Sequence, residues 1–178
     1  MMKTSIRQIL LTIVIVLVVF GVLHTTVQSF EVDGSSMEDN FHDGQYLIVE
    51  KVSYRFSSPD RGDVIIFNHP VTQDKLLIKR VIGLPGEKVE IIEGKIYIDG
   101  YLLEETSDFG SSISYSDSYS VRVPDDNYFV LGDNRAISGD SLSEHWTVPR
   151  DEIIGRVWIR YWPPGDWGLS PGYSWDLS

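Results

Sequence analysis

The stretch LLIKRVI (residues 76–82) decides the fold class, because it carries charged residues within an apolar run of strand length. Successive side chains of a β-strand point to opposite faces, so Leu77, Lys79 and Val81 would share one face. Similar β-rich runs occur at residues 46–49, 63–67, 89–92, 96–98, 128–131 and 153–161. We therefore predict a mostly β fold, with short strands in a Greek-key or barrel-like arrangement rather than a parallel sheet with crossover helices.

One long apolar run precedes these strands. Residues 8–30 contain no Asp, Glu, Lys or Arg, and about 20 such residues suffice for a helix to cross a bilayer. We predict an uncleaved transmembrane anchor over residues 8–29, because no small-x-small cleavage site follows it. Lys3 and Arg7 are the only charges before the run, which predicts a cytoplasmic segment 1–7 and an outer domain 30–178 on a single-pass protein of the cell membrane.

The amino-acid composition limits the kinds of site and partner that this chain can have. The chain has 178 residues, no cysteine and a formal net charge of −11. The lack of cysteine excludes thiol nucleophiles and thiolate metal sites. The four histidines are scattered without a ligand spacing, so we expect neither a metal nor another cofactor. The negative charge argues against nucleic acid as a partner, while the apolar run indicates contact with a lipid bilayer.

Residues 86–127 are predicted to form an insertion in the outer domain. The runs VEII and IYI flank Glu93-Gly94-Lys95, a pattern typical of a β-hairpin. Residues 107–120 hold seven serines and little aliphatic content. We interpret them as a loop without a chemical role.

Candidate chemistry lies in three places. Ser36, in GSSMED (residues 34–39), follows closely on the apolar run and needs a base to act as a nucleophile. Lys79 could be that base, because burial among apolar neighbours lowers the pKa of a lysine. Taken singly, the serine is more typical of a turn and the lysine of a solvent-exposed strand end. The segment GDNRAISGDS (residues 132–141) fits either a capped turn or hydrogen-bonding support for a base.

The order of these features resembles bacterial type I signal peptidases, which are membrane-anchored serine proteases with a Ser/Lys dyad. The resemblance rests on the anchor, the Ser-Met pair, KRVIGLPGE (residues 79–87) and GDNRAISGDS, and the single anchor resembles the Gram-positive form. It implies that the outer domain is catalytic, with Ser36 as nucleophile and Lys79 as general base. It also implies exported preproteins as substrates, cleaved after their signal peptides, and an oxyanion hole that includes the main-chain N–H of Ser36.

The resemblance also assigns supporting residues. Ser138 matches the serine that orients the lysine, and Asp140 the aspartate that stabilises the site beside it. Asp133 and Arg135 match positions expected to give structural support. Leu76 and Ile78, on the strand before the lysine, are our candidates for the walls of shallow apolar pockets, and that strand could pair with an extended substrate.

Three positions depart from the family pattern. Asp39-Asn40 stands where Pro-Thr is common, and Gly34 stands where some members carry a serine as a second oxyanion donor. Leu142 replaces the usual arginine after Asp140-Ser141, which removes an expected charge partner of the aspartates.

Two other functions are compatible with parts of the sequence. A self-cleaving Ser/Lys regulator of the repressor type would need an N-terminal DNA-binding domain, where this chain has an apolar run. A catalytically impaired homologue could act as a membrane-anchored chaperone in surface-protein or pilus assembly. The presence of both Ser36 and Lys79 favours the enzyme.

Overall fold

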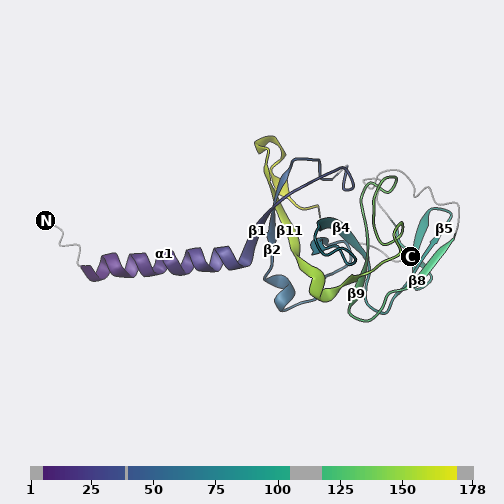
Figure 1. The fold of residues 1–178 in the computed structure, drawn as a ribbon, viewed down its shortest axis with the longest axis horizontal. Coiled ribbons are helices and arrows are strands. Elements are labelled where there is room, and N and C mark those ends of the chain that lie inside the picture. Colours follow the sequence, from purple (N-terminus) through teal and green to yellow (C-terminus); the bar gives the residue numbers. More distant parts are fainter. Residues whose placement is uncertain (1–5, 39, 105–117, 172–178) are drawn as a thin grey trace.

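The structure is a computed structural model that describes residues 6–38, 40–104 and 118–171. A single long helix, α1 (Ile6–Thr26), projects from a β domain and runs directly into the first strand, β1 (Val27–Glu31) (Figure 1). Elsewhere in these ranges the helices are short 3₁₀ turns, η1 (Ser53–Arg55), η2 (Arg150–Glu152) and η3 (Pro164–Asp166). The mostly β prediction is therefore confirmed.

Helix α1 is built mainly from leucine and β-branched residues, and the described apolar side chains along it are largely exposed. Ile9 is 50% exposed and Phe20 is 65% exposed. The helix ends at Thr26, three residues before the predicted end of the anchor, because Val27–Glu31 pair with the next strand. Over the part of the chain that the structure describes, no helix combines the length and the apolarity needed to cross a membrane.

An antiparallel sheet of eight strands forms the body of the domain, in the order β1-β2-β11-β3-β4-β9-β10 with β12 beside β11. Its further strands are β2 (Tyr46–Glu50), β3 (Val64–Asn68), β4 (Leu76–Gly83), β9 (Asn127–Leu131), β10 (Val148–Pro149), β11 (Ile153–Trp162) and β12 (Gly168–Leu169). All pairings are antiparallel, as expected from the absence of crossover helices. The order has two open ends, so the described strands do not form the closed barrel that a barrel-like arrangement would suggest.

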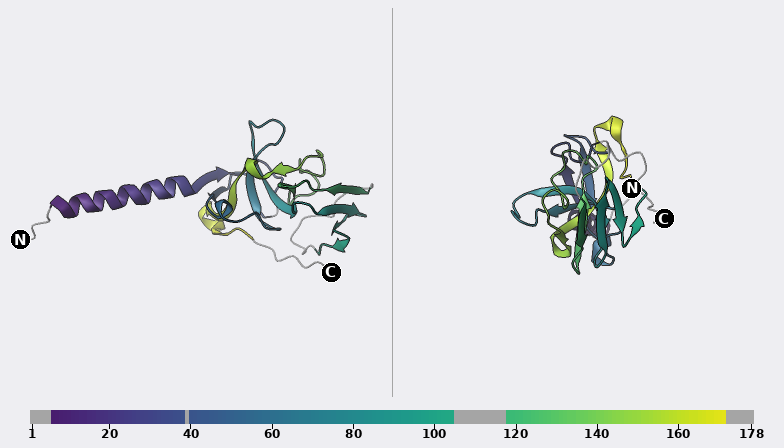
Figure 2. Two further views of the ribbon diagram at one scale, coloured as in Figure 1. Left: turned by 90° about the horizontal axis from the view of Figure 1, so that it is seen from below. Right: turned by 90° about the vertical axis from the view of Figure 1, so that its right-hand side faces the viewer.

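A second sheet of four strands, in the order β7-β6-β5-β8, lies at the end of the domain far from α1 (Figures 1 and 2). It contains β5 (Lys88–Ile92), β6 (Lys95–Ile98), β7 (Tyr101–Leu102) and β8 (Tyr119–Arg122). The predicted hairpin is confirmed as β5 and β6, with Glu93 and Gly94 both at positive φ in the turn. Of the predicted serine-rich loop, residues 107–117 lie outside the described residues, and residues 119–120 belong to β8.

Side chains of strand β4 contribute to three separate clusters of buried apolar residues. On one of its faces Ile78 packs in a cluster that also contains Met37 and Phe41. On the other face Val81 packs with residues of β3, β9 and β10. Beyond them, Ile82 joins a third cluster that fills the space beneath the second sheet. A charged side chain in the middle of this strand is therefore enclosed by packed apolar residues.

Candidate active site

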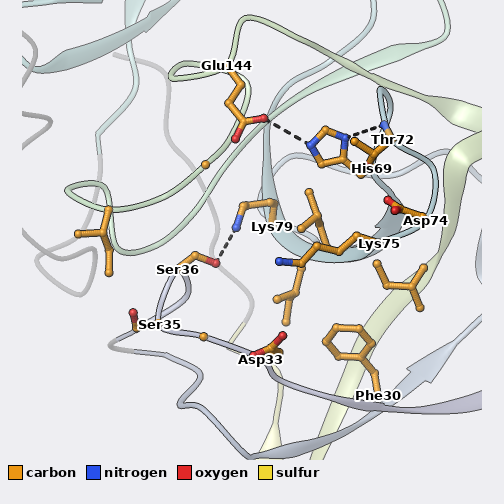
Figure 3. A pocket seen from close by; sticks show the side chains of 16 residues that line it. Phe30, Asp33, Ser35, Ser36, His69, Thr72, Asp74, Lys75, Lys79 and Glu144 are labelled. Atoms are coloured by element: carbon orange, nitrogen blue, oxygen red, sulfur yellow. Dashed lines mark hydrogen bonds and ion pairs between the residues drawn. The ribbon is translucent and has the colours of Figure 1, made fainter.

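Ser36 and Lys79 meet in the folded chain although they are 43 positions apart in sequence. Lys79 Nζ lies 2.6 Å from Ser36 Oγ (Figure 3). Ser36 comes from the turn that follows β1, and Lys79 comes from the middle of β4. The arrangement places an amine within hydrogen-bond distance of a hydroxyl, the geometry that a serine nucleophile requires of its base.

The turn that carries Ser36 is held on both sides. Met37 is fully buried in the core beneath it, and the carbonyl of Ser36 accepts a hydrogen bond from the main-chain N–H of Asn134 at 3.1 Å. The N–H of Gly34 donates to Asp43 Oδ1 at 2.7 Å. Gly34 has a φ of +92°, which favours glycine. A serine side chain as oxyanion donor at this position would require a strained backbone.

Lys79 is only 3% exposed. Burial lowers the pKa of its ammonium group from 10.5 to about 8, although the nearby carboxylates of Asp140 and Asp133 act in the opposite direction. Desolvation dominates because a charged amine loses its hydration when it is enclosed by protein. A lysine in this state is neutral in a substantial fraction of molecules near neutral pH and can then accept a proton.

The loop after β9 holds Asp140 through main-chain hydrogen bonds, and among the described residues its carboxylate forms no ion pair within 4.0 Å. The carboxylate accepts hydrogen bonds from the main-chain N–H groups of Gly132 at 3.1 Å, Leu142 at 3.1 Å and Ser143 at 3.2 Å. Such donors stabilise a buried carboxylate. The side chain of Leu142, where the family pattern has arginine, packs in the third core cluster. Main-chain N–H groups thus stabilise the Asp140 carboxylate in a loop where no arginine follows Ser141.

Ser138 lies beside the nucleophile turn. Its hydroxyl is buried and, among the described residues, has no hydrogen-bond partner. The separation from Gly132 is very small, since a Cβ atom at that position would lie 2.3 Å from Ser138 Oγ and 2.5 Å from the carbonyl oxygen of Ser36. The structure therefore brings Ser36 and Ser138 together around Gly132. The orientation of Lys79 by Ser138 stays a prediction.

Asp133 and Arg80 form a fully buried ion pair behind the dyad. Arg80 Nε and Nη2 donate to the two oxygens of Asp133 at 2.8 and 2.6 Å, and both side chains are 0% exposed. Asn40 Nδ2 also donates to Asp133, at 2.9 Å. Arg135 Nε donates to the carbonyl of Gly132 at 3.0 Å. The structural support expected of Asp133 therefore involves Arg80, the residue that follows Lys79 on β4.

A pocket of about 570 Å³ opens over the dyad (Figure 3). The predicted wall residues Leu76 and Ile78 both line it, together with Phe30. Residues 76–79 pair with β3 on one side, whereas the pairing of β4 with β9 starts only at Arg80. None of the described strands pairs with this second edge of residues 76–79, which leaves it available to an additional strand.

Two further pocket residues were missed by the sequence reasoning. His69 Nε2 lies 3.4 Å from Glu144 Oε2, and both side chains line the pocket that contains Lys79. Across the residues that the structure describes, no three His, Cys, Asp or Glu side chains form a group able to hold a metal ion. Nothing local in the sequence indicates a contact between residues so far apart.

Known proteins with this sequence pattern are peptidases. Residues 5–162 match the family described as signal peptidase, peptidase S26. Probable signal peptidase I-2 of Synechocystis is 37% identical over 177 residues, covering 94% of this chain and 74% of the relative. Signal peptidase I T of Bacillus subtilis is 33% identical over 160 residues, covering 85% of this chain and 82% of the relative.

A crystal structure of a signal peptidase I from Enterococcus faecalis is 33% identical in sequence, with a TM-score of 0.48, and covers 56% of this chain and 97% of that one. The family match spans most of the chain, including the turn of Ser36, the strand of Lys79 and the loop of Ser138. The chain therefore belongs to the signal peptidase family, peptidase S26.

Proposed function

We propose that this protein is a serine endopeptidase that removes signal peptides from exported preproteins through a Ser36/Lys79 dyad. The observation that carries the proposal is the 2.6 Å contact between Ser36 Oγ and a buried Lys79 Nζ. A chaperone that had lost the chemistry would have no need of this contact. The relatives, which are named signal peptidases, supply the substrate class.

Acylation begins with Lys79 neutral. Ser36 Oγ attacks the carbonyl carbon at the cleavage site while its proton passes to Lys79 Nζ, which becomes an ammonium. Lys79 then returns this proton to the leaving amine, so the peptide C–N bond breaks and an ester on Ser36 remains. The 2.6 Å separation between Lys79 Nζ and Ser36 Oγ allows the first of these transfers without movement of the backbone.

Deacylation repeats the cycle with water. Neutral Lys79 takes a proton from a water molecule as its oxygen attacks the ester, and the proton is returned to Ser36 Oγ when the ester breaks. The main-chain N–H of Ser36 would donate to the oxyanion in both halves. One such donor typically contributes about 3 to 4 kcal/mol. Asn134 holds the carbonyl of the same residue and so fixes the orientation of the turn.

The substrate would bind as an added strand. An extended peptide can pair with the open edge of residues 76–79, which carries its reactive carbonyl towards Ser36. Leu76, Ile78 and Phe30 offer apolar surface for the residues before the cleavage site. Small side chains at these positions would fit the pocket without displacing Lys79 from its contact.

We also propose that residues 8–29 attach the protein to the cell membrane, with residues 1–7 in the cytoplasm and the catalytic domain 30–178 outside. The proposal is supported by the absence of charged residues between positions 8 and 30 and by the exposure of the apolar side chains of α1. Ser36 is ten residues beyond the end of α1, so it lies within about 35 Å of it even on an extended chain. The test is alkaline extraction of membranes, and complete release of the protein would refute the attachment.

The activity is tested with the detergent-solubilised protein and a purified preprotein, comparing the wild type with Ser36→Ala and Lys79→Met. Methionine retains much of the volume of lysine without an amine, so the pocket stays filled. The wild type should release the mature protein, and both variants should be inactive. Equal processing by the wild type and either variant would refute the dyad, and failure of the wild type on preproteins of several lengths would refute the substrate class.

A further inference from the structure

His69 and Glu144 join two segments that flank the dyad. His69 lies in the turn between β3 and β4, the strand that carries Lys79. Glu144 lies in the loop that carries Ser138 and Asp140. Figure 3 shows their side chains meeting above Lys79 at the wall of the pocket, with His69 Nε2 3.4 Å from Glu144 Oε2.

The hydrogen bonds of His69 fix which ring nitrogen carries the proton. Nδ1 accepts from the main-chain N–H groups of Val71 at 3.1 Å and Thr72 at 3.3 Å. A nitrogen that accepts two hydrogen bonds bears no proton, so the proton of the neutral ring is on Nε2. The turn thereby presents an N–H group to the carboxylate of Glu144.

Glu144 is held from three further sides. Its Oε2 accepts from Trp146 Nε1 at 2.7 Å, and its main-chain N–H donates to the carbonyl of Asp140 at 2.9 Å. Its Oε1 occupies the space beside Gly139, where a Cβ atom would lie only 2.6 Å away. The ring of Trp146 packs in turn on the ring of His69 at 5.6 Å between centroids. These contacts fix the position of the Glu144 carboxylate, although 46% of this side chain is exposed.

We propose that His69 and Glu144 are positioning residues of the proteolytic site, which hold the loop of Ser138 and Asp140 against the strand of Lys79 and place a negative charge facing the lysine. The inference rests on the proposed function. It assigns two separate effects to the pair: a mechanical one, which needs both residues, and an electrostatic one, which needs only the charge of Glu144.

The electrostatic effect has a definite sign. The charged groups that act on Lys79 are Asp140, Asp133 and Glu144, which raise its pKa, and Lys75, which lowers it. Burial has the largest effect and lowers the pKa of Lys79. The three carboxylates oppose this lowering, and Lys75 adds to it. Removing the charge of Glu144 should therefore lower the pKa of Lys79, and the activity should persist to lower pH.

Four variants separate the two effects. Glu144→Gln retains an oxygen acceptor for Trp146 and removes only the charge, whereas Glu144→Ala removes both. His69→Asn retains an acceptor for the two N–H groups of the turn, as asparagine does in turns, but loses the N–H towards Glu144. The matched control is Glu152→Ala, which removes the other tie of the same turn, the 2.9 Å bond from Gln73 Nε2 to Glu152 Oε1.

The expected results differ for each variant in a preprotein cleavage assay across pH. Glu144→Gln should keep the plateau value of kcat and shift the acid limb of the profile about 0.3 to 1 pH unit lower. His69→Asn should lower kcat about tenfold or more with little change in KM, since a small displacement of reacting groups is costly. Glu144→Ala should show both changes. Glu152→Ala should match the wild type in kcat and in pH profile.

A second measurement does not depend on proteolysis. The pH dependence of Lys79 acetylation by acetic anhydride, followed by mass spectrometry, reports its neutral fraction directly, and its midpoint should move lower in Glu144→Gln. If the wild type cleaves no preprotein but this midpoint moves, the proposed function fails and the electrostatic role of Glu144 stands. Unchanged kcat and midpoint in Glu144→Gln, Glu144→Ala and His69→Asn would overturn the inference. Equal losses in Glu152→Ala would also overturn it, because they would indicate a general effect of loosening the turn.

Discussion

The acid limb of the activity profile is the most direct test of Lys79 as general base. The perturbation is a change of pH from about 5 to 10 at a fixed preprotein concentration. Only the neutral amine accepts the proton of Ser36, so the rate should follow the fraction of Lys79 that is neutral. Burial lowers the pKa of Lys79 to about 8, and the rate should therefore rise as pH rises and level off above pH 8.

The size of the effect follows from this pKa. With a pKa of about 8, about 9% of the Lys79 side chains are neutral at pH 7, compared with about 0.03% for a lysine of pKa 10.5. The buried environment therefore increases the amount of active base about 300-fold at pH 7. Below pH 7 the rate should fall about tenfold for each pH unit.

The assay is a single-turnover measurement of preprotein cleavage, which reports acylation without the influence of product release. The purified enzyme is mixed in excess over labelled preprotein at each pH, and its fold is checked by circular dichroism under the same conditions. A rate that stays level from pH 8 down to pH 5, with the fold intact, would refute the role of Lys79 as base.

Three substitutions should have effects that follow from the same geometry. Lys79→Met should raise the free energy of unfolding by about 3 kcal/mol at pH 7, because the folded state depresses the pKa of this lysine. Urea titrations should show this gain in full below pH 8, shrinking between pH 8 and 10.5, and a pH-independent difference would contradict it. Asp133→Asn removes the buried carboxylate that pairs with Arg80 through two hydrogen bonds and should lower the free energy of unfolding by about 3 to 5 kcal/mol in the same titrations, whereas a loss below 1 kcal/mol would show the pair to be dispensable. Gly132→Ala places a methyl group 2.3 Å from Ser138 Oγ and should lower kcat more than tenfold in a folded protein, so full activity would show that the loop can move freely.

The strand that carries Lys79 could be predicted because the information is local. The alternation of residues 76–82 indicated a strand with Lys79 between apolar neighbours, and β4 covers residues 76–83. The hairpin turn at Glu93-Gly94 was an equally local signal. The beginning of β1 was not predicted, because Val27 continues an apolar run whose composition suits a helix as well as a strand.

The partners of the site residues could not be predicted in the same way. Arg80 and Asp133 are 53 positions apart, and His69 and Glu144 belong to segments whose residue types are common in turns. Such contacts depend on how β3, β4 and β9 are placed side by side, which no short sequence pattern specifies. The sequence indicated that Leu142 removes one expected charge partner of the aspartates, but not that main-chain N–H groups of the loop bind Asp140.

The adjacent residues Lys79 and Arg80 explain how one strand can hold a neutral base among acidic groups. Of the carboxylates that act on Lys79, those of Asp140 and Asp133 have the largest effects, and each stabilises its ammonium form. Arg80 points to the opposite face of the strand and engages Asp133 through two hydrogen bonds, while Asp140 is bound by main-chain N–H groups. Both carboxylates thus have their hydrogen-bonding needs met by groups other than the lysine, which leaves Lys79 Nζ directed at Ser36. The burial that depresses the pKa of Lys79 is tolerated because the surrounding charges are satisfied independently of its protonation state.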